Sequence, residues 1–183
     1  MSNQEDLDDE PRVGISLYEF YAIGFERLLK HAPWELERAV SVYHESFLTE
    51  QRCLGLAILL LLGEDHVPRE AVESMPGFED QTRASVNQAV FRRALKHYFQ
   101  AAQLNPVRAD MVLDRMQSYV TDSRAANNRQ ESPLSAMLDI MSRRVPPRSE
   151  EQHALYATRV EKIYDYIDGL VEGSLLKRYE ISS

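Results

Sequence analysis

Residues 53–62 read CLGLAILLLL, the most apolar stretch of the chain. A helix that is apolar on every side belongs in the interior of a protein, because any face turned to water would expose apolar surface. The stretch is far shorter than the roughly 20 residues that a membrane span needs. We therefore predict a central, fully buried helix over residues 50–62, with Thr49 as its N-cap and Gly63 just after its end.

Two further helices are expected on the N-terminal side of this stretch. Ser16 and Glu19 have the spacing of a capping box, and the helix that they open should end near His31. Pro33 suits the first turn of the next helix. Its apolar stripe consists of Leu36, Val40, Tyr43 and Phe47. Residues 1–12 are acidic and polar, and we expect them to form a disordered tail.

Prolines and polar clusters divide the rest of the chain into more helices. The signals predict a short helix from Pro68 and longer helices over 82–104, 106–120 and 133–144, with a loop over 121–131. A terminal helix should begin at Ser149 with Gln152, and should kink or end at Gly169 or Gly173. No segment alternates as a strand does. The expected fold is all-α: a single domain over residues 13–183, with about seven to eight helices around the buried apolar central helix.

Composition and motifs exclude several classes of function. The one cysteine, Cys53, allows no intramolecular disulfide and no thiolate cluster for a metal. The sequence contains no glycine-rich phosphate loop, no H-E-x-x-H and no G-x-S-x-G motif, so we expect no cofactor, no metal and no enzyme activity. The acidic start, MSNQEDLDDEPR, has neither the basic nor the apolar region of a signal peptide, and we expect a cytoplasmic protein that does not contact a membrane.

Charge is distributed unevenly along the chain. The whole chain carries a net charge of −8, yet residues 83–148 carry eleven basic and five acidic side chains, a balance of +6. Residues 1–80 carry six basic and seventeen acidic side chains, a balance of −11. Several basic residues on the predicted helices 82–104 and 106–120 have no acidic residue three or four positions away, where a helical partner would lie. These residues are Arg92, Arg93, Lys96, Arg108 and Arg115.

These five residues predict a basic binding face, with three possible uses. They can pair across the fold with the acidic N-terminal half, bind an acidic protein, or bind nucleic acid phosphates, since arginine suits bidentate contacts with carboxylate and phosphate. No nucleic-acid-binding module supports the third use. The favoured function is a non-enzymatic interaction protein, such as an adaptor, regulatory or accessory subunit of a larger assembly. The alternative is a small nucleic-acid-binding subunit.

A third hypothesis follows from the spacing of Arg92 and His97. The segment Arg92-Arg-Ala-Leu-Lys-His97 resembles the R-x4-H motif of the HEPN ribonuclease superfamily, although Arg93 stands where that family usually has a polar residue such as asparagine. Those proteins are small and all-helical, and the resemblance implies that Arg92 and His97 act on RNA at a dimer interface. Residues five apart lie about 140° apart around a helix, so both reach one site only across a kink or a dimer.

The terminal helix carries an apolar seam with the spacing of helix–helix packing. The seam consists of Tyr156, Val160, Ile163, Ile167 and Leu170. It covers only about two heptads, fewer than a coiled coil needs. The favoured interpretation is packing on the core of the same chain, and the alternative is a homodimer interface.

Overall fold

The computed structural model describes residues 11–31, 44–73, 82–103 and 106–182. The helices within these ranges are α1 (Leu17–His31), α2 (His44–Glu64), α3 (Arg69–Glu73), α4 (Arg83–Ala101), α5 (Pro106–Asn128), α6 (Pro133–Arg144), α7 (Glu150–Leu170) and α8 (Leu176–Arg178), with a π-helical turn over Val171–Leu175 between the last two. Two short strands are β1 (Val13–Ile15) and β2 (Tyr179–Ile181).

The prediction of an all-α fold is confirmed, but the described ranges contain six long helices rather than the seven to eight predicted. Six of the helices in the described ranges have twelve residues or more. The short helices α3 and α8 have only five and three residues. Residues 33–43 of the helix predicted from Pro33 lie outside the described residues, as do residues 1–10 of the predicted tail. The last residue of its predicted stripe, Phe47, belongs to α2 instead.

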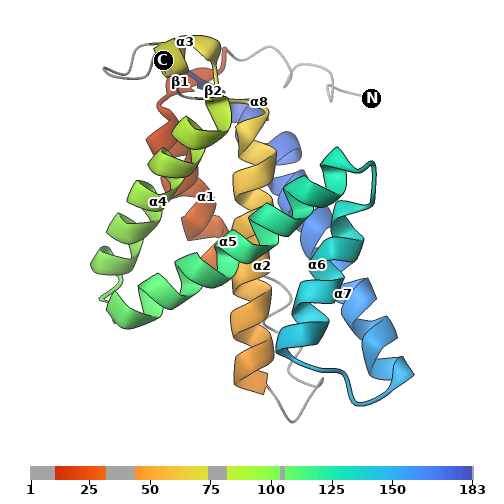
Figure 1. Cartoon of the computed structure of the whole chain (residues 1–183). Coiled ribbons are helices and arrows are strands. Elements are labelled where there is room, and N and C mark those ends of the chain that lie inside the picture. Colours follow the sequence, from red (N-terminus) through yellow and green to blue (C-terminus); the bar gives the residue numbers. More distant parts are fainter. Residues whose placement is uncertain (1–10, 32–43, 74–81, 104–105, 183) are drawn as a thin grey trace, which may run out of the picture.

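Helix α2 is the centre of the fold, as its apolar sequence predicts. It contacts α1, α4, α5, α6 and α7, and Figure 1 shows it upright in the middle, with α5 crossing it. Residues 53–60 are all buried, and most of them have no exposed surface at all. Because burial of each large aliphatic side chain stabilises the fold by about 1.5–3 kcal/mol, this helix supplies a large part of the hydrophobic stabilisation.

Both predicted ends of the central helix are wrong. Helix α2 begins at His44, so Thr49 lies inside it rather than at its N-cap. Gly63 also lies inside the helix, which continues to Glu64. The glycine has a different role there, because a Cβ atom at position 63 would overlap the hydroxyl group of Tyr21. Gly63 thus permits the close approach of α1 to α2.

The loop predicted over residues 121–131 is mostly helix. Helix α5 runs to Asn128, and a positive φ of 58° at Gln130 follows its end. Ser123 and Ala126 are buried, and Arg124 forms an ion pair with Glu64 of α2. Tertiary contacts therefore stabilise a helix in a segment whose polar composition predicts a loop.

The helix starts predicted from the capping pairs at Ser16 and Ser149 are confirmed. Ser16 and Glu19 bond reciprocally, with 2.8 Å from Ser16 N to Glu19 Oε2 and 3.2 Å from Glu19 N to Ser16 Oγ. The hydroxyl group of Thr82 accepts from the backbone of α4, and that of Ser149 accepts from Gln152 N at 3.1 Å. Helix α7 ends at Leu170, directly after one of the two glycines at which an end is predicted.

A short parallel strand pair joins the two ends of the described chain, contrary to the prediction of no strands. Val13 pairs with Tyr179, Gly14 with Glu180 and Ile15 with Ile181. Each strand has only three residues, so neither is long enough to show alternation in the sequence. The pairing holds the start of α1 beside the turn that follows α7.

The apolar seam of α7 packs inside the chain. Tyr156, Val160, Ile163 and Ile167 have at most 1% of their surface exposed, and Leu170 has 7%. These side chains belong to the same buried cluster as the residues of α2. The favoured interpretation of the seam is therefore correct, and none of its five side chains is exposed for a homodimer interface. No helix in the described ranges has the length and apolarity to cross a membrane.

Candidate functional site

The basic residues predicted as one binding face divide into two groups in the structure. Arg92, Arg93 and Lys96 lie on α4, at the left edge of the molecule in Figure 1. Arg115 lies on α5 and turns toward α2. Arg108 is in the first turns of α5, but its side chain is outside the described part of the chain.

The α4 group carries no ion pair with a described residue. Arg93 and Lys96 are exposed and Arg92 is half-buried. The outward stripe of this helix contains no acidic side chain; its residues are Ser85, Ala89, Arg93, Lys96 and Gln100. We call Arg92, Arg93 and Lys96 the α4 basic face.

Arg115 instead joins a buried cluster around Glu50. The Glu50 side chain is only 1% exposed, and its Oε1 accepts from Arg115 Nη1 at 2.9 Å. Its Oε2 accepts from Arg144 Nη1 at 3.0 Å and from the Tyr119 hydroxyl group at 2.8 Å. The Arg144 guanidinium also lies 5.2 Å from the centre of the Tyr119 ring. The carboxylate is thus paired and hydrogen-bonded, as a buried charge must be.

We call Glu50, Arg115, Tyr119 and Arg144 the Glu50 cluster. Burial, followed by the charge of Glu50, raises the pKa of Tyr119 above its usual range, so this phenol stays protonated and donates. Burial likewise raises the pKa of the neighbouring Cys53 thiol to about 12. Such a thiol is an inert apolar group rather than a nucleophile.

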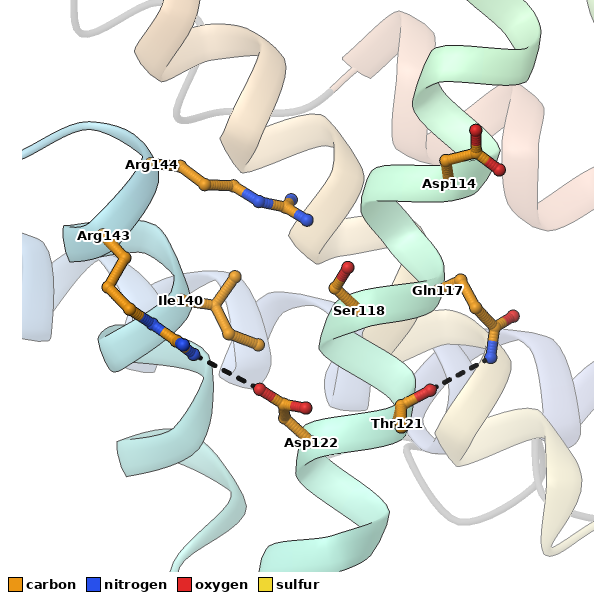
Figure 2. A pocket seen from close by; sticks show the side chains of 8 residues that line it. All are labelled: Asp114, Gln117, Ser118, Thr121, Asp122, Ile140, Arg143 and Arg144. Atoms are coloured by element: carbon orange, nitrogen blue, oxygen red, sulfur yellow. Dashed lines mark hydrogen bonds and ion pairs between the residues drawn. The ribbon is translucent and has the colours of Figure 1, made fainter.

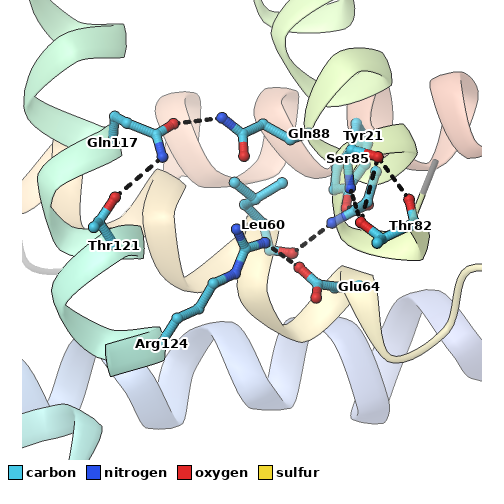
Figure 3. A network of polar contacts seen from close by, with 10 residues as sticks. Tyr21, Leu60, Glu64, Thr82, Ser85, Gln88, Gln117, Thr121 and Arg124 are labelled. Carbon is cyan, nitrogen blue, oxygen red and sulfur yellow. Dashed lines mark hydrogen bonds and ion pairs between the residues drawn. The ribbon is translucent and has the colours of Figure 1, made fainter. Parts of the chain in front are cut away.

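A second polar network joins α1, α2, α4 and α5 (Figure 3). The Tyr21 hydroxyl group donates to Asn87 Oδ1, and Asn87 Nδ2 donates to the Leu60 carbonyl at 3.0 Å. Gln88 Nε2 donates to Gln117 Oε1 at 2.6 Å, and Arg124 pairs with Glu64. These contacts satisfy buried polar groups between packed helices, and they fix the position of α4 relative to α2 and α5.

A pocket of about 510 Å³ lies between α5 and α6, beside the Glu50 cluster. Figure 2 shows its eight lining residues: Asp114, Gln117, Ser118, Thr121, Asp122, Ile140, Arg143 and Arg144. Arg143 Nη2 reaches across from α6 to Asp122 Oδ2 at 3.3 Å. The pocket therefore contains two carboxylates and two guanidinium groups, with an apolar wall at Ile140.

The residues of the R-x4-H motif do not converge within one chain. Helix α4 is continuous from Arg83 to Ala101, so Arg92 and His97 lie about 140° apart around its axis. His97 Nδ1 lies 2.8 Å from the Tyr18 hydroxyl group of α1. No group of three or more histidine, cysteine, aspartate or glutamate side chains within the described ranges is arranged to hold a metal ion.

Sequence reasoning missed the Glu50 cluster and the pocket. Glu50 is 65 and 94 positions from its two arginines, and no spacing rule connects residues so far apart. The one available signal is a carboxylate at the edge of the apolar stretch of α2, in a chain whose residues 83–148 are rich in arginine. Comparisons with protein-family models, curated proteins and solved structures gave no match to this chain.

Proposed function

We propose that this protein is a non-enzymatic interaction protein, an adaptor, regulatory or accessory subunit that binds an acidic surface of another protein through the α4 basic face. One observation supports this proposal above the others. Arg92, Arg93 and Lys96 have no ion pair with a described residue, whereas Arg115, Arg124, Arg143 and Arg144 all have one. The α4 basic face thus remains available to a partner.

The spacing of the α4 basic face supports a binding role rather than a folding role. Arg92 and Lys96 are four positions apart and Arg93 and Lys96 are three apart, so like charges are neighbours on the helix. Such pairs destabilise a helix by about 0.2–0.5 kcal/mol each. A carboxylate-rich partner would remove this repulsion, and the two arginines can each bind a carboxylate with two parallel hydrogen bonds.

The size of the face and the charge of the chain favour an acidic protein over nucleic acid. Nucleic-acid affinity comes largely from neutralising many phosphates. The α4 basic face supplies three charges, and Arg83 lies nine positions from Arg92, on the opposite side of the helix. A net charge of −8 repels a long polyanion, while a local acidic patch on a protein meets only the local positive field.

The test compares two double variants with the same change in charge. Arg93→Ala with Lys96→Ala removes two charges from the α4 basic face, and Lys177→Ala with Arg178→Ala removes two exposed charges from α8. Proteins that co-purify with the wild type from its own cells, identified by mass spectrometry after nuclease treatment, should be retained by the α8 variant and lost by the α4 variant. Equal retention by both variants would refute the proposal.

The same variants distinguish the other two hypotheses. Partners that disappear after nuclease treatment, together with steeply salt-dependent binding of the purified protein to RNA or DNA, would favour a nucleic-acid-binding subunit. Cleavage of RNA by the wild type that His97→Ala abolishes would favour the HEPN-like ribonuclease. We expect neither result.

A further inference from the structure

The pocket between α5 and α6 holds one arginine in a fixed position. Arg144 Nη1 donates to Glu50 Oε2 at 3.0 Å and to the Arg115 carbonyl at 3.2 Å, and the guanidinium lies over the Tyr119 ring. Its Nε and Nη2 groups form no hydrogen bond within the described part of the chain, although Arg144 lines the pocket. These N–H groups are donors that an incoming acceptor meets without first ordering the side chain.

The second arginine of the pocket is held weakly. Arg143 and Asp122 are 3.3 Å apart, and their side chains are 70% and 46% exposed. An ion pair this exposed contributes about 0–1 kcal/mol, because water screens it and both side chains lose freedom in forming it. Arg143 can therefore exchange Asp122 for another carboxylate at little cost, provided that Asp122 also finds a new partner.

The remaining lining groups extend the site along α5. Asp114 is exposed and forms no ion pair with a described residue. Ser118 and Thr121 lie between the two aspartates on the same helix, and Ile140 faces them from α6 (Figure 2). The lining thus presents positive charge on α6, negative charge on α5, hydroxyl groups between the two aspartates and one apolar wall.

This arrangement selects a ligand by its charges. A simple anion would meet Asp114 and Asp122, and a simple cation would meet Arg143 and Arg144, so each would gain one attraction and one repulsion. A molecule that carries both charges gains two attractions. We propose that the pocket binds a zwitterion of the α-amino-acid class, with its carboxylate on Arg143 and Arg144, its ammonium group on Asp122, and its side chain beside Ile140.

Binding by this arrangement replaces one exposed ion pair by two. The ligand carboxylate takes the place of Asp122 on Arg143, and the ligand ammonium group takes the place of Arg143 on Asp122. No charge is left without a partner, which is the condition for a favourable polar site. The volume of about 510 Å³ accommodates a free amino acid together with water, and it leaves room for a dipeptide.

The experiment is a titration of the isotope-labelled full chain with the standard free L-amino acids, followed by NMR of the backbone amides of residues 114–122 and 140–144. We expect at least one amino acid to shift these signals at concentrations up to about 10 mM, a range that includes weak binding. Its N-acetyl derivative lacks the positive charge and its amide lacks the negative charge. Each should bind at least about tenfold more weakly, about 1.4 kcal/mol.

Two exposed substitutions test the residues of the site. Arg143→Gln and Asp122→Asn should each weaken binding about tenfold. The matched control is Arg129→Gln, which removes another exposed arginine–carboxylate pair, that of Arg129 with Glu131 just after the end of α5, and should leave binding unchanged. The proposal is refuted if no amino acid shifts the pocket signals, if the N-acetyl derivative binds as tightly as its parent, or if Arg143→Gln behaves like the control. None of these outcomes bears on the α4 basic face, so the two proposals fail independently.

Discussion

The basic residues of α4 and those of α5 and α6 come from one arginine-rich stretch of sequence but meet different surroundings. On α5 and α6, Arg115 and Arg144 share the buried carboxylate of Glu50. On α4, Arg93 and Lys96 are exposed and have no ion pair with a described residue. The comparison teaches that basic residues from one stretch of sequence can divide between a buried ion-pair cluster, here the Glu50 cluster, and an exposed surface, here the α4 basic face.

Substitutions in the Glu50 cluster and on the α4 basic face should also differ in their effect on the stability of the fold. A substitution in the Glu50 cluster removes a partner from the buried carboxylate or from the arginines that it neutralises, and the penalty for that exceeds what the intact pair contributes. A substitution on the α4 basic face leaves only a solvated surface, where changes usually stay within about 0.5 kcal/mol. Stability measurements therefore separate the two groups, whatever the partner of the protein is.

The largest effect is expected for Glu50→Gln. Glutamine keeps the size of the side chain but removes the charge that neutralises Arg115 and Arg144, so the free energy of unfolding should fall by about 3 kcal/mol. Denaturation by urea measures the change. The control, Glu131→Gln, removes the exposed partner of Arg129 and should change stability by less than about 0.5 kcal/mol. A similarly small change for Glu50→Gln would mean that its arginines are adequately solvated without it.

The next effect compares one arginine from each group. Arg115→Ala removes one of the two cationic partners of Glu50 and should lower the free energy of unfolding by about 2 kcal/mol, since Arg144 still neutralises the carboxylate. Arg93→Ala should change it by less than about 0.5 kcal/mol. Equal losses from the two substitutions, measured by the same urea titration, would show that the α4 basic face also has a folding role.

A smaller effect is expected from alkaline pH. Burial and the charge of Glu50 raise the pKa of Cys53 from 9.0 to about 12, so the folded state holds this proton more tightly than the unfolded state. The resulting stabilisation is complete below about pH 9 and is lost as the pH rises through about 12. Between about pH 8 and pH 10 the free energy of unfolding should fall by on the order of 1 kcal/mol. In Cys53→Ala the fall should be smaller; an equal fall would assign it to other groups.

The sequence predicts the elements whose signals are local. The apolar stretch, the capping pairs at Ser16 and Ser149, and the seam of α7 each depend on neighbours within a few positions. The capping pairs, the seam and the burial of residues 53–60 are confirmed, whereas Leu61 and Leu62 are only half-buried. The predicted loop over 121–131 is wrong because its helix depends on burial against distant residues. The helix propensities of a polar segment are weak compared with such tertiary contacts.

The candidate sites could be predicted only in part, for the same reason. The absence of acidic neighbours on α4 is visible in the sequence, and Arg93 and Lys96 are indeed exposed. The same rule groups Arg115 with them, because it compares only residues within one helix. The partner of Arg115 is on another helix, and a pocket such as that between α5 and α6 exists only once two helices pack.

The smallest effect tests the α4 basic face without removing any of it. Ala89 is exposed, three positions before Arg92 and four before Arg93, so Ala89→Glu places a carboxylate beside both. Relative to Ala89→Gln, which has the same shape and no charge, this pairing should raise the free energy of unfolding by about 0.2–0.5 kcal/mol, because glutamate is N-terminal to its partners. It should also weaken binding of poly-L-glutamate, a probe for an acidic surface, measured by fluorescence anisotropy at low salt. An increase in stability with unchanged binding would mean that the face is free of internal partners but does not bind carboxylates, and the proposed function would then lose its main support.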